Sequence, residues 1–233
     1  AKSWQMFCQR AEAELYKWMS LNREVLSSHH IAAKRLENWS SNSQSTPLIT
    51  SIGRLTSQKF ALLLNSTPQG VPLARILDVL AECNGRIVVI GSGEPNIENE
   101  LCRLMGQHRN LLFLNGYSEN LPEYLYKLGD LFLMPSSFEP CGISQMLAMR
   151  EGQPCLVHQI GGLADTVEHS VTGFSFSGEN TDIQSENLVN TFIQAMTMYS
   201  DRKSEWDKMC LRTKQKRFDW QVSILRYINE LYS

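Results

Sequence analysis

The polar residues with the clearest chemical potential follow short apolar runs, and the first such group contains two cations. Arg54 and Lys59 lie five residues apart within residues 53–59, GRLTSQK. An arginine supplies a planar fork of donors and a lysine a point charge, so together they could neutralise a diphosphate and stabilise it as a leaving group. Solvated surface cations are the alternative interpretation of the same pair.

The densest cluster occupies residues 135–145, PSSFEPCGISQ, where an apolar run gives way to a helical pattern. Backbone N–H groups at that helix start, with the hydroxyl of Ser144, could bind a phosphate. Glu139 could then hold sugar hydroxyls, although a carboxylate is also favoured near a helix start for electrostatic reasons alone. No histidine adjoins Cys141, so we expect a close-packed small residue there rather than a nucleophile.

Three further positions follow other apolar runs. Gly91 and Gly93 let a ligand approach the backbone, but the third glycine of a dinucleotide fingerprint is missing, which favours a tight strand-to-helix turn. Tyr117 either stacks on a nucleotide base or packs against the protein. His158 is expected to form a hydrogen bond or to be exposed, and a general-base role is the less favoured alternative.

The elements that must position these residues alternate between strand and helix patterns. The apolar runs are continuous rather than alternating, which indicates strands buried on both faces of a parallel sheet. We therefore predict an α/β fold with a Rossmann-like, doubly wound parallel sheet, in which ligands bind beyond the carboxyl ends of the strands. The expected strands are Leu48–Ile52, Arg86–Ile90, Leu111–Asn115, Leu131–Met134 and Cys155–Val157.

The chain divides into three segments by composition and periodicity. Residues 1–46 predict a helical appendage that ends in a serine-rich linker, because apolar residues recur at positions 4, 8, 11, 15 and 18 and a second helical stretch covers about 31–39. Residues 47–217 form the Rossmann-like domain. Residues 218–233 predict a C-terminal amphipathic helix, which packs on its own domain or on another. No methionine or domain-opening strand begins the chain, so we expect a fragment of a longer polypeptide.

Composition excludes several classes of protein. No apolar run approaches the roughly 20 residues that a bilayer requires, and no secretory signal opens the chain. The six scattered cysteines indicate reduced thiols, with neither a disulfide nor a zinc site. Residues 47–200 carry 8 Lys+Arg against 15 Asp+Glu, a charge of −7, which disfavours nucleic acid as a partner.

Four motifs occur in a fixed order: RLTSQK at 54–59, GY at 116–117, FEPCG at 138–142 and GGLADTV at 161–167, followed by FDWQ at 218–221. Together they resemble the C-terminal half of bacterial glycogen synthases and plant starch synthases over about residues 47–233. The family is typified by two facing Rossmann-like domains, the GT-B architecture, and by retaining transfer of glucose from ADP-glucose to the non-reducing end of an α-1,4-glucan. The resemblance thus implies a missing N-terminal domain, a glucan acceptor, no metal or other cofactor, and a cytoplasmic or plastid-stroma location.

The resemblance also implies roles for single residues. Arg54 and Lys59 would hold the diphosphate and stabilise the departing ADP as catalytic residues, with Glu139 as the third. Tyr117 would contact the adenine. The donor glucose would be lined by Glu139, Cys141 and Gly142, and the distal phosphate would meet backbone and hydroxyl donors of Ile143 and Ser144.

Several departures from the family pattern keep alternatives open. Phe60 stands where a glycine is usual, Ser137 where an arginine is usual, and His158-Gln159 where two arginines are common. Leu147 replaces a second glutamate of related families and favours the starch-synthase type. The N-terminal Lys-X-Gly-Gly signature and the catalytic-domain histidine of the family are absent from this chain, so the fragment alone is expected to be inactive. The alternatives are a GT-B transferase for another nucleotide sugar and a non-catalytic descendant that binds nucleotide sugar or glucan.

Overall fold

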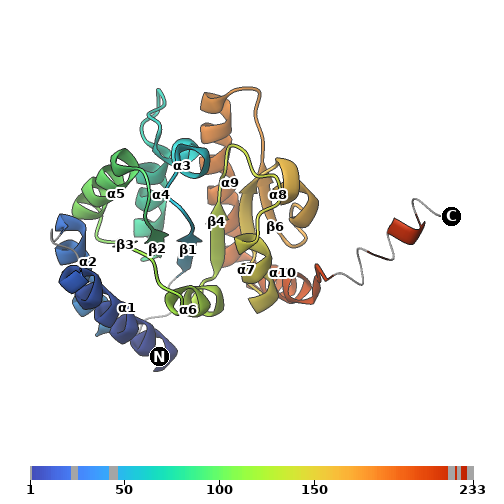
Figure 1. The fold of residues 1–233 in the computed structure, drawn as a ribbon. Helices are drawn as coiled ribbons and strands as arrows, with labels where there is room; N and C mark the ends of the chain where they lie inside the picture. Colours follow the sequence, from blue (N-terminus) through green and yellow to red (C-terminus); the bar gives the residue numbers. More distant parts are fainter. Residues whose placement is uncertain (1, 22–25, 42–46, 220–223, 225–226, 230–233) are drawn as a thin grey trace.

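The computed structural model describes residues 2–21, 26–41, 47–219, 224 and 227–229. Within these residues, six strands form one parallel sheet in the order β3-β2-β1-β4-β5-β6 (Figure 1). The order reverses between β1 and β4, which is the switch point of a doubly wound, Rossmann-like sheet. The predicted fold class is therefore confirmed. The strands are β1 Leu48–Ile52, β2 Arg86–Gly91, β3 Leu111–Asn115, β4 Leu131–Met134, β5 Cys155–His158 and β6 Gly173–Phe176.

The five predicted strands all occur, and two of them extend one residue further than expected. The sixth strand, β6, was missed. Its sequence, GFSF, is short and begins with glycine, and it lies at the edge of the sheet, where it pairs only with β5. An edge strand needs no continuous apolar run, so its sequence signal is weak.

Helices cover both faces of the sheet (Figure 1). In the described part, α4 and α9 pack together on one face, and α6 and α7 lie on the other. Pro72 and Pro95 occupy the first positions of α4 and α5, where a missing N–H costs nothing. The helices that follow residue 47 are α3 Ser57–Leu64, α4 Pro72–Glu82, α5 Pro95–Gln107, α6 Leu121–Leu128, α7 Ser144–Glu151, α8 Gly161–Thr166, α9 Thr181–Asp201 and α10 Lys203–Gln215.

Two helices precede the sheet, α1 Lys2–Leu21 and α2 Ser27–Ser40. They pack against each other, α2 lies along β3, and α1 contacts α6. The predicted apolar stripe of the first helix is buried, since Leu15 is inaccessible and Trp18 is 8% exposed. The second helix begins four residues earlier than predicted. None of the described helices is both long and apolar enough to cross a membrane.

The helix predicted for residues 218–233 lies for the most part outside the described residues. Ile224 and residues 227–229 are described, and they are helical and exposed. Nothing in the structure tests which domain this segment packs against.

Candidate functional site

The loops after β1, β2 and β3 enclose a pocket at the carboxyl edge of the sheet. Its volume is about 220 Å³. Each loop follows the last residue of a parallel strand, so the strand order brings three segments together that are far apart in the sequence. The lining residues are Ile52, Gly53, Arg54, Ile90, Gly91, Ser92, Gly116, Tyr117, Ser118 and Pro122.

Gly91, the last residue of β2, and Gly93, in the loop that follows, allow two of these loops to come into contact. A Cβ atom on Gly91 would lie 2.0 Å from the carbonyl oxygen of Gly53, and one on Gly93 would lie 2.2 Å from that of Leu55. The N–H of Gly116 donates to the Gly91 carbonyl at 3.1 Å and joins the third loop. The predicted tight turn is confirmed, and only glycine fits at either position.

The Glu94 carboxylate, in the loop after β2, caps the N-terminus of α3. It accepts hydrogen bonds from the hydroxyl of Ser57 at 2.6 Å and from the Ser57 N–H at 2.8 Å. These bonds, the hydroxyl bond first, lower the pKa of Glu94 below its ordinary 4.5. No side chain of α3 itself caps this terminus, so a residue of another loop does so.

This arrangement predicts a pH dependence. A carboxyl whose pKa is lowered on folding stabilises the fold above its unfolded pKa, and that stabilisation disappears as the pH falls through the folded value. We expect the Glu94→Gln variant to lose less stability than the wild type between about pH 5 and pH 3. Urea unfolding at a series of pH values measures this difference. Equal slopes in both proteins would show that Glu94 does not contribute.

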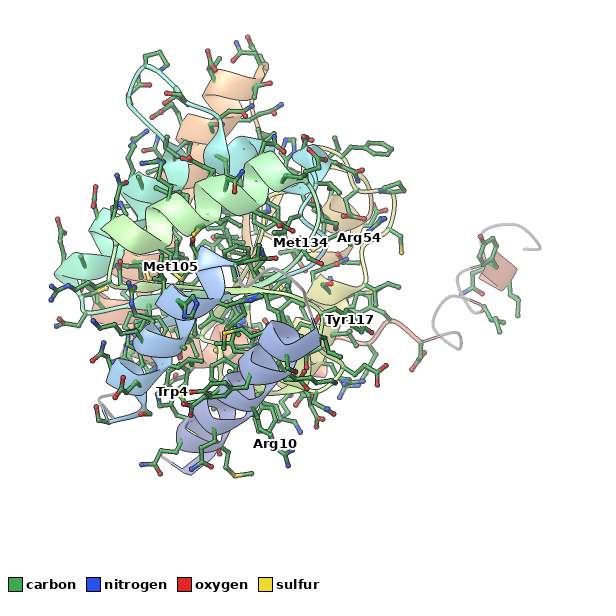
Figure 2. The ribbon with its side chains drawn as sticks, turned by 60° about the vertical axis from the view of Figure 1, so that its left-hand side comes forward. Trp4, Arg10, Arg54, Met105, Tyr117 and Met134 are labelled. Atoms are coloured by element: carbon green, nitrogen blue, oxygen red, sulfur yellow. The ribbon has the colours of Figure 1, made fainter. Side chains whose placement is uncertain are left out.

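Arg54 and Tyr117 both line the pocket, and Figure 2 shows them on the same side of the molecule. The Arg54 side chain is exposed. Tyr117 is 74% exposed, so the interpretation of this tyrosine as a packing residue is wrong. Its ring is available to a planar ligand, because an exposed aromatic face can stack on a base.

Lys59 and Glu139 form an ion pair across the switch point. Lys59 lies on α3, which follows β1, and Glu139 lies in the loop that follows β4. The Lys59 Nζ atom lies 2.7 Å from Glu139 Oε2, and the two side chains are 21% and 12% exposed. The Ser136 hydroxyl also faces the same carboxylate oxygen, at 3.4 Å. The two predicted cations therefore differ in their partners. Within the described residues Arg54 forms no ion pair with a carboxylate, whereas Lys59 pairs with Glu139, 80 positions later in the chain.

The loop that carries Glu139 is fixed from both sides. From α3, the Gln58 side chain donates to the Phe138 carbonyl at 2.6 Å, and the Gln58 carbonyl accepts from the Ser137 N–H at 2.8 Å. From α8, the Gly162 N–H donates to the Glu139 carbonyl at 3.0 Å. Hydrogen bonds to two helices thus hold this loop, in addition to the contact of Ser136 with the Glu139 carboxylate.

Gln145 is a site residue that the sequence analysis missed. It is inaccessible to solvent, and its Nε2 donates to the carbonyls of Cys141 and Gly142 at 3.2 and 3.0 Å. Gly142 has a φ of 75°, a left-handed conformation that glycine adopts without strain. The position of Gln145 directly after Gly142 and Ser144 at a predicted helix start was the only signal in the sequence, because its burial is decided by the tertiary structure.

The start of α7 presents backbone donors to this site. Within the described residues, the N–H groups of Ser144, Gln145 and Met146 have no hydrogen-bond acceptor, and α7 has no side-chain N-cap. Burial raises the pKa of Tyr126, and a hydrogen bond with Ser144 opposes that shift. The backbone N–H groups of residues 144–146 are therefore available as donors at this terminus.

Two other predictions are corrected in part. Cys141 is exposed, so the expectation of a close-packed small residue is wrong. His158 is 4% exposed, and its Nδ1 lies 3.0 Å from the Ser136 carbonyl oxygen. Burial lowers the pKa of His158, and the contact with Ser136 opposes the shift. Hydrogen bonding is confirmed for His158, and exposure is not.

The departures from the family pattern lie mostly in packing positions. Phe60 is 3% exposed and belongs to the main hydrophobic core. Leu147 is half-buried against a second apolar cluster. A larger hollow of about 560 Å³ lies away from the carboxyl edge, between α2 and the amino ends of β2 and β3. Among the described residues, no group of three or more His, Cys, Asp or Glu side chains is arranged to hold a metal.

Comparison with known families gives a direct match. Residues 46–197 match the family model described as "Glycosyl transferases group 1". The chain is 37% identical to the glycogen synthase of Lactococcus lactis and 34% identical to that of Desulfitobacterium hafniense, in each case over 80% of this chain. It spans 37% and 38% of those two proteins, so it corresponds to less than half of their length.

Solved structures show the same architecture. The catalytic domain of Arabidopsis thaliana starch synthase IV, bound to ADP and acarbose, is 26% identical with a TM-score of 0.68, over 87% of this chain and 41% of that one. Anabaena HepE in complex with UDP-glucose is 21% identical with a TM-score of 0.58, over 87% of this chain and 52% of the other, and shares the fold alone.

Proposed function

The chain belongs to the group 1 family of glycosyl transferases, and from this premise we propose that it is the donor-binding domain of a glycogen or starch synthase. The whole enzyme would transfer glucose from ADP-glucose to the non-reducing end of an α-1,4-glucan with retention. The relatives at 34–37% identity support this assignment. The location that goes with it is the cytoplasm, or the plastid stroma in a plant or alga.

The observation that carries the proposal is the ion pair of Lys59 and Glu139. It joins α3, which begins just after the pocket residues Gly53 and Arg54, to the loop that leads into α7. A nucleotide sugar needs a base site, cationic groups for its diphosphate and an acceptor for its sugar hydroxyls. Tyr117, Arg54 and Lys59 would supply the first two of these. Glu139 would supply the third, next to Cys141 and Gly142.

In this proposal the positive charges and N–H donors of the folded domain stabilise the leaving group of the reaction. As the bond between glucose and the diphosphate breaks, negative charge grows on the departing ADP, and Arg54, Lys59 and the N–H groups of Ile143 and Ser144 would stabilise it. Lys59 has to exchange its bond with Glu139 for one with phosphate, which frees the carboxylate for the sugar. The proposed chemistry assigns no step to a metal or other cofactor.

The second, N-terminal domain is part of the proposal. The chain spans 37–38% of the bacterial relatives, and in a GT-B enzyme the acceptor lies between two domains. We expect this chain alone to bind the donor without transferring glucose.

Calorimetric titration of the 233-residue chain tests the donor site. ADP-glucose is expected to bind more tightly than UDP-glucose. Arg54→Ala should weaken the binding of ADP-glucose by about 10-fold or more, because one charged hydrogen bond contributes about that much to affinity. Arg202→Ala is the matched control, because Arg202 is exposed, pairs with Glu205 at the start of α10 and does not line the pocket. A preference for UDP-glucose would favour a GT-B transferase with another donor, and equal effects of both variants would remove Arg54 from the site.

Alkylation of thiols gives an independent test. Cys83 and Cys141 are exposed, whereas burial raises the pKa of Cys8 to about 12 and also raises that of Cys155. Iodoacetamide should modify the two exposed thiols first. Saturating ADP-glucose should protect Cys141 and leave Cys83, at the end of α4, as reactive as before; peptide mass spectrometry measures both. Equal protection of the two thiols, or of neither, would contradict the proposed sugar site.

A further inference from the structure

The two N-terminal helices reach the proposed nucleotide pocket, although the sequence presents them as an appendage. We propose that Trp18, on α1, is a positioning residue for the nucleotide base and that the helix pair α1–α2 is part of the base-recognition site. This inference rests on the proposed function, because it concerns the same pocket. It assigns to α1 and α2 a role in base recognition in addition to packing.

Trp18 contacts the pocket wall in two ways. Its indole N–H donates to the carbonyl oxygen of Tyr117 at 3.1 Å. Its ring also lies directly on Gly116, because a Cβ atom there would be 2.6–2.7 Å from three indole atoms. Both residues line the pocket. In Figure 2 the end of α1 lies beside Tyr117, and Trp4 marks the opposite end of the helix.

A second connection runs from α2 to the glycine turn. His29 Nε2 lies 2.8 Å from the Asn115 carbonyl oxygen, so it is the donor of a buried hydrogen bond. The Asn115 amide donates to Glu98 Oε2 at 3.1 Å, and the other oxygen of Glu98 accepts from the Gly93 N–H at 2.8 Å. Two of the three pocket loops are therefore linked to the helix pair, one directly and one through Asn115 and Glu98.

These contacts affect base binding because they orient the backbone that carries the Tyr117 ring. The Tyr117 side chain is 74% exposed, so its own packing does little to orient it. Its direction depends on the backbone of residues 116–118, and within the described part Trp18 supplies the side-chain bond to the Tyr117 carbonyl. A ring that stacks on a base binds more tightly when it is ordered beforehand, since less conformational freedom is lost on binding. Among the described residues, no hydrogen bond or cation–π contact joins Trp18 to Arg54 or Lys59, the cationic part of the site.

The test compares two tryptophan substitutions in the full 233-residue chain. Trp18→Phe keeps an aromatic ring and removes the N–H that reaches Tyr117. Trp4→Phe is the matched control, because Trp4 Nε1 donates a similar bond, to the Trp39 carbonyl at 3.2 Å, within the same helix pair but away from the pocket. Titrations use ADP and, as a ligand without a base, inorganic pyrophosphate.

We expect Trp18→Phe to weaken ADP binding by about 3- to 10-fold, the weight of one neutral hydrogen bond, and to leave pyrophosphate binding within about 2-fold of wild type. Trp4→Phe should leave both affinities unchanged. Amide hydrogen exchange in the ligand-free chain should become faster at residues 116–121 in Trp18→Phe only. In Gly116→Ala the added Cβ atom should displace the Trp18 ring, although the indole N–H is still present. This variant should show the same weaker ADP binding and faster exchange as Trp18→Phe.

The outcomes separate this inference from the proposed function. Exchange at residues 116–121 that is no faster in Trp18→Phe than in Trp4→Phe would overturn it, whatever the ligands do. Equal weakening of ADP and pyrophosphate would also overturn it, since the role of Trp18 would then be general stability. If wild-type protein binds neither ligand, the proposed function fails and the role in base recognition fails with it, while the exchange data still decide whether Trp18 orders the loop.

Discussion

Replacement of Lys59 by methionine is expected to weaken ADP-glucose binding by about 10- to 100-fold, because a charged hydrogen bond to phosphate contributes about 1.5–3 kcal/mol. Methionine keeps the length of the side chain and removes its charge. The ion pair with Glu139 is partly exposed, so its loss should change the free energy of unfolding by no more than about 1 kcal/mol. Calorimetric titration and thermal unfolding measure the two effects separately.

Lys127→Met is the matched control for this experiment. Lys127 forms a similarly short ion pair, 2.6 Å with Glu123, on the surface of α6. A comparable loss of affinity in both variants would show that Lys59 acts through net charge and does not touch the donor. The partner substitution Glu139→Gln should have the opposite signature. It should leave ADP affinity unchanged or tighter, because the acid no longer competes for Lys59, and it should reduce the advantage of ADP-glucose over ADP.

Gly162→Ala is expected to lower both stability and donor affinity. The added Cβ atom would lie 2.1 Å from the carbonyl oxygen of Cys141 and 2.5 Å from its Cα atom, so backbone has to move. Overpacking of this kind costs about 1–3 kcal/mol, which corresponds to roughly 3–10 °C in the melting temperature of a domain of this size. The displaced loop carries Glu139 and Gly142, so ADP-glucose binding should weaken as well.

Gly106→Ala is the control that the chain offers for this substitution. Gly106 lies in α5 with nothing within 4 Å of an added Cβ atom, and alanine is the better helix former. Its melting temperature should stay unchanged or rise slightly, and donor affinity should not change. A Gly162→Ala protein that is as stable as wild type and binds ADP-glucose normally would contradict the argument that this glycine permits the close approach of the loop.

The sequence determined the local features of the fold. Five of the six strands were predicted at the correct positions, because residues buried on both faces of a sheet must be continuously apolar whatever their neighbours are. It also determined where polar clusters follow strands, and thus which residues could reach the carboxyl edge. The burial of one stripe of α1 followed from the spacing of its apolar residues.

Only the tertiary structure decided which of those residues meet. Lys59 pairs with Glu139, a partner that the sequence did not indicate. Cys141 is exposed although a close-packed residue was expected there, and Tyr117 is exposed where packing was one of two alternatives. The bond from Trp18 to Tyr117 spans 99 positions of the chain. Periodicity and turn signals report the burial of a residue within its own element. Strand order and helix docking depend on the simultaneous packing of all elements, so contacts between distant loops have no signature in a single local pattern.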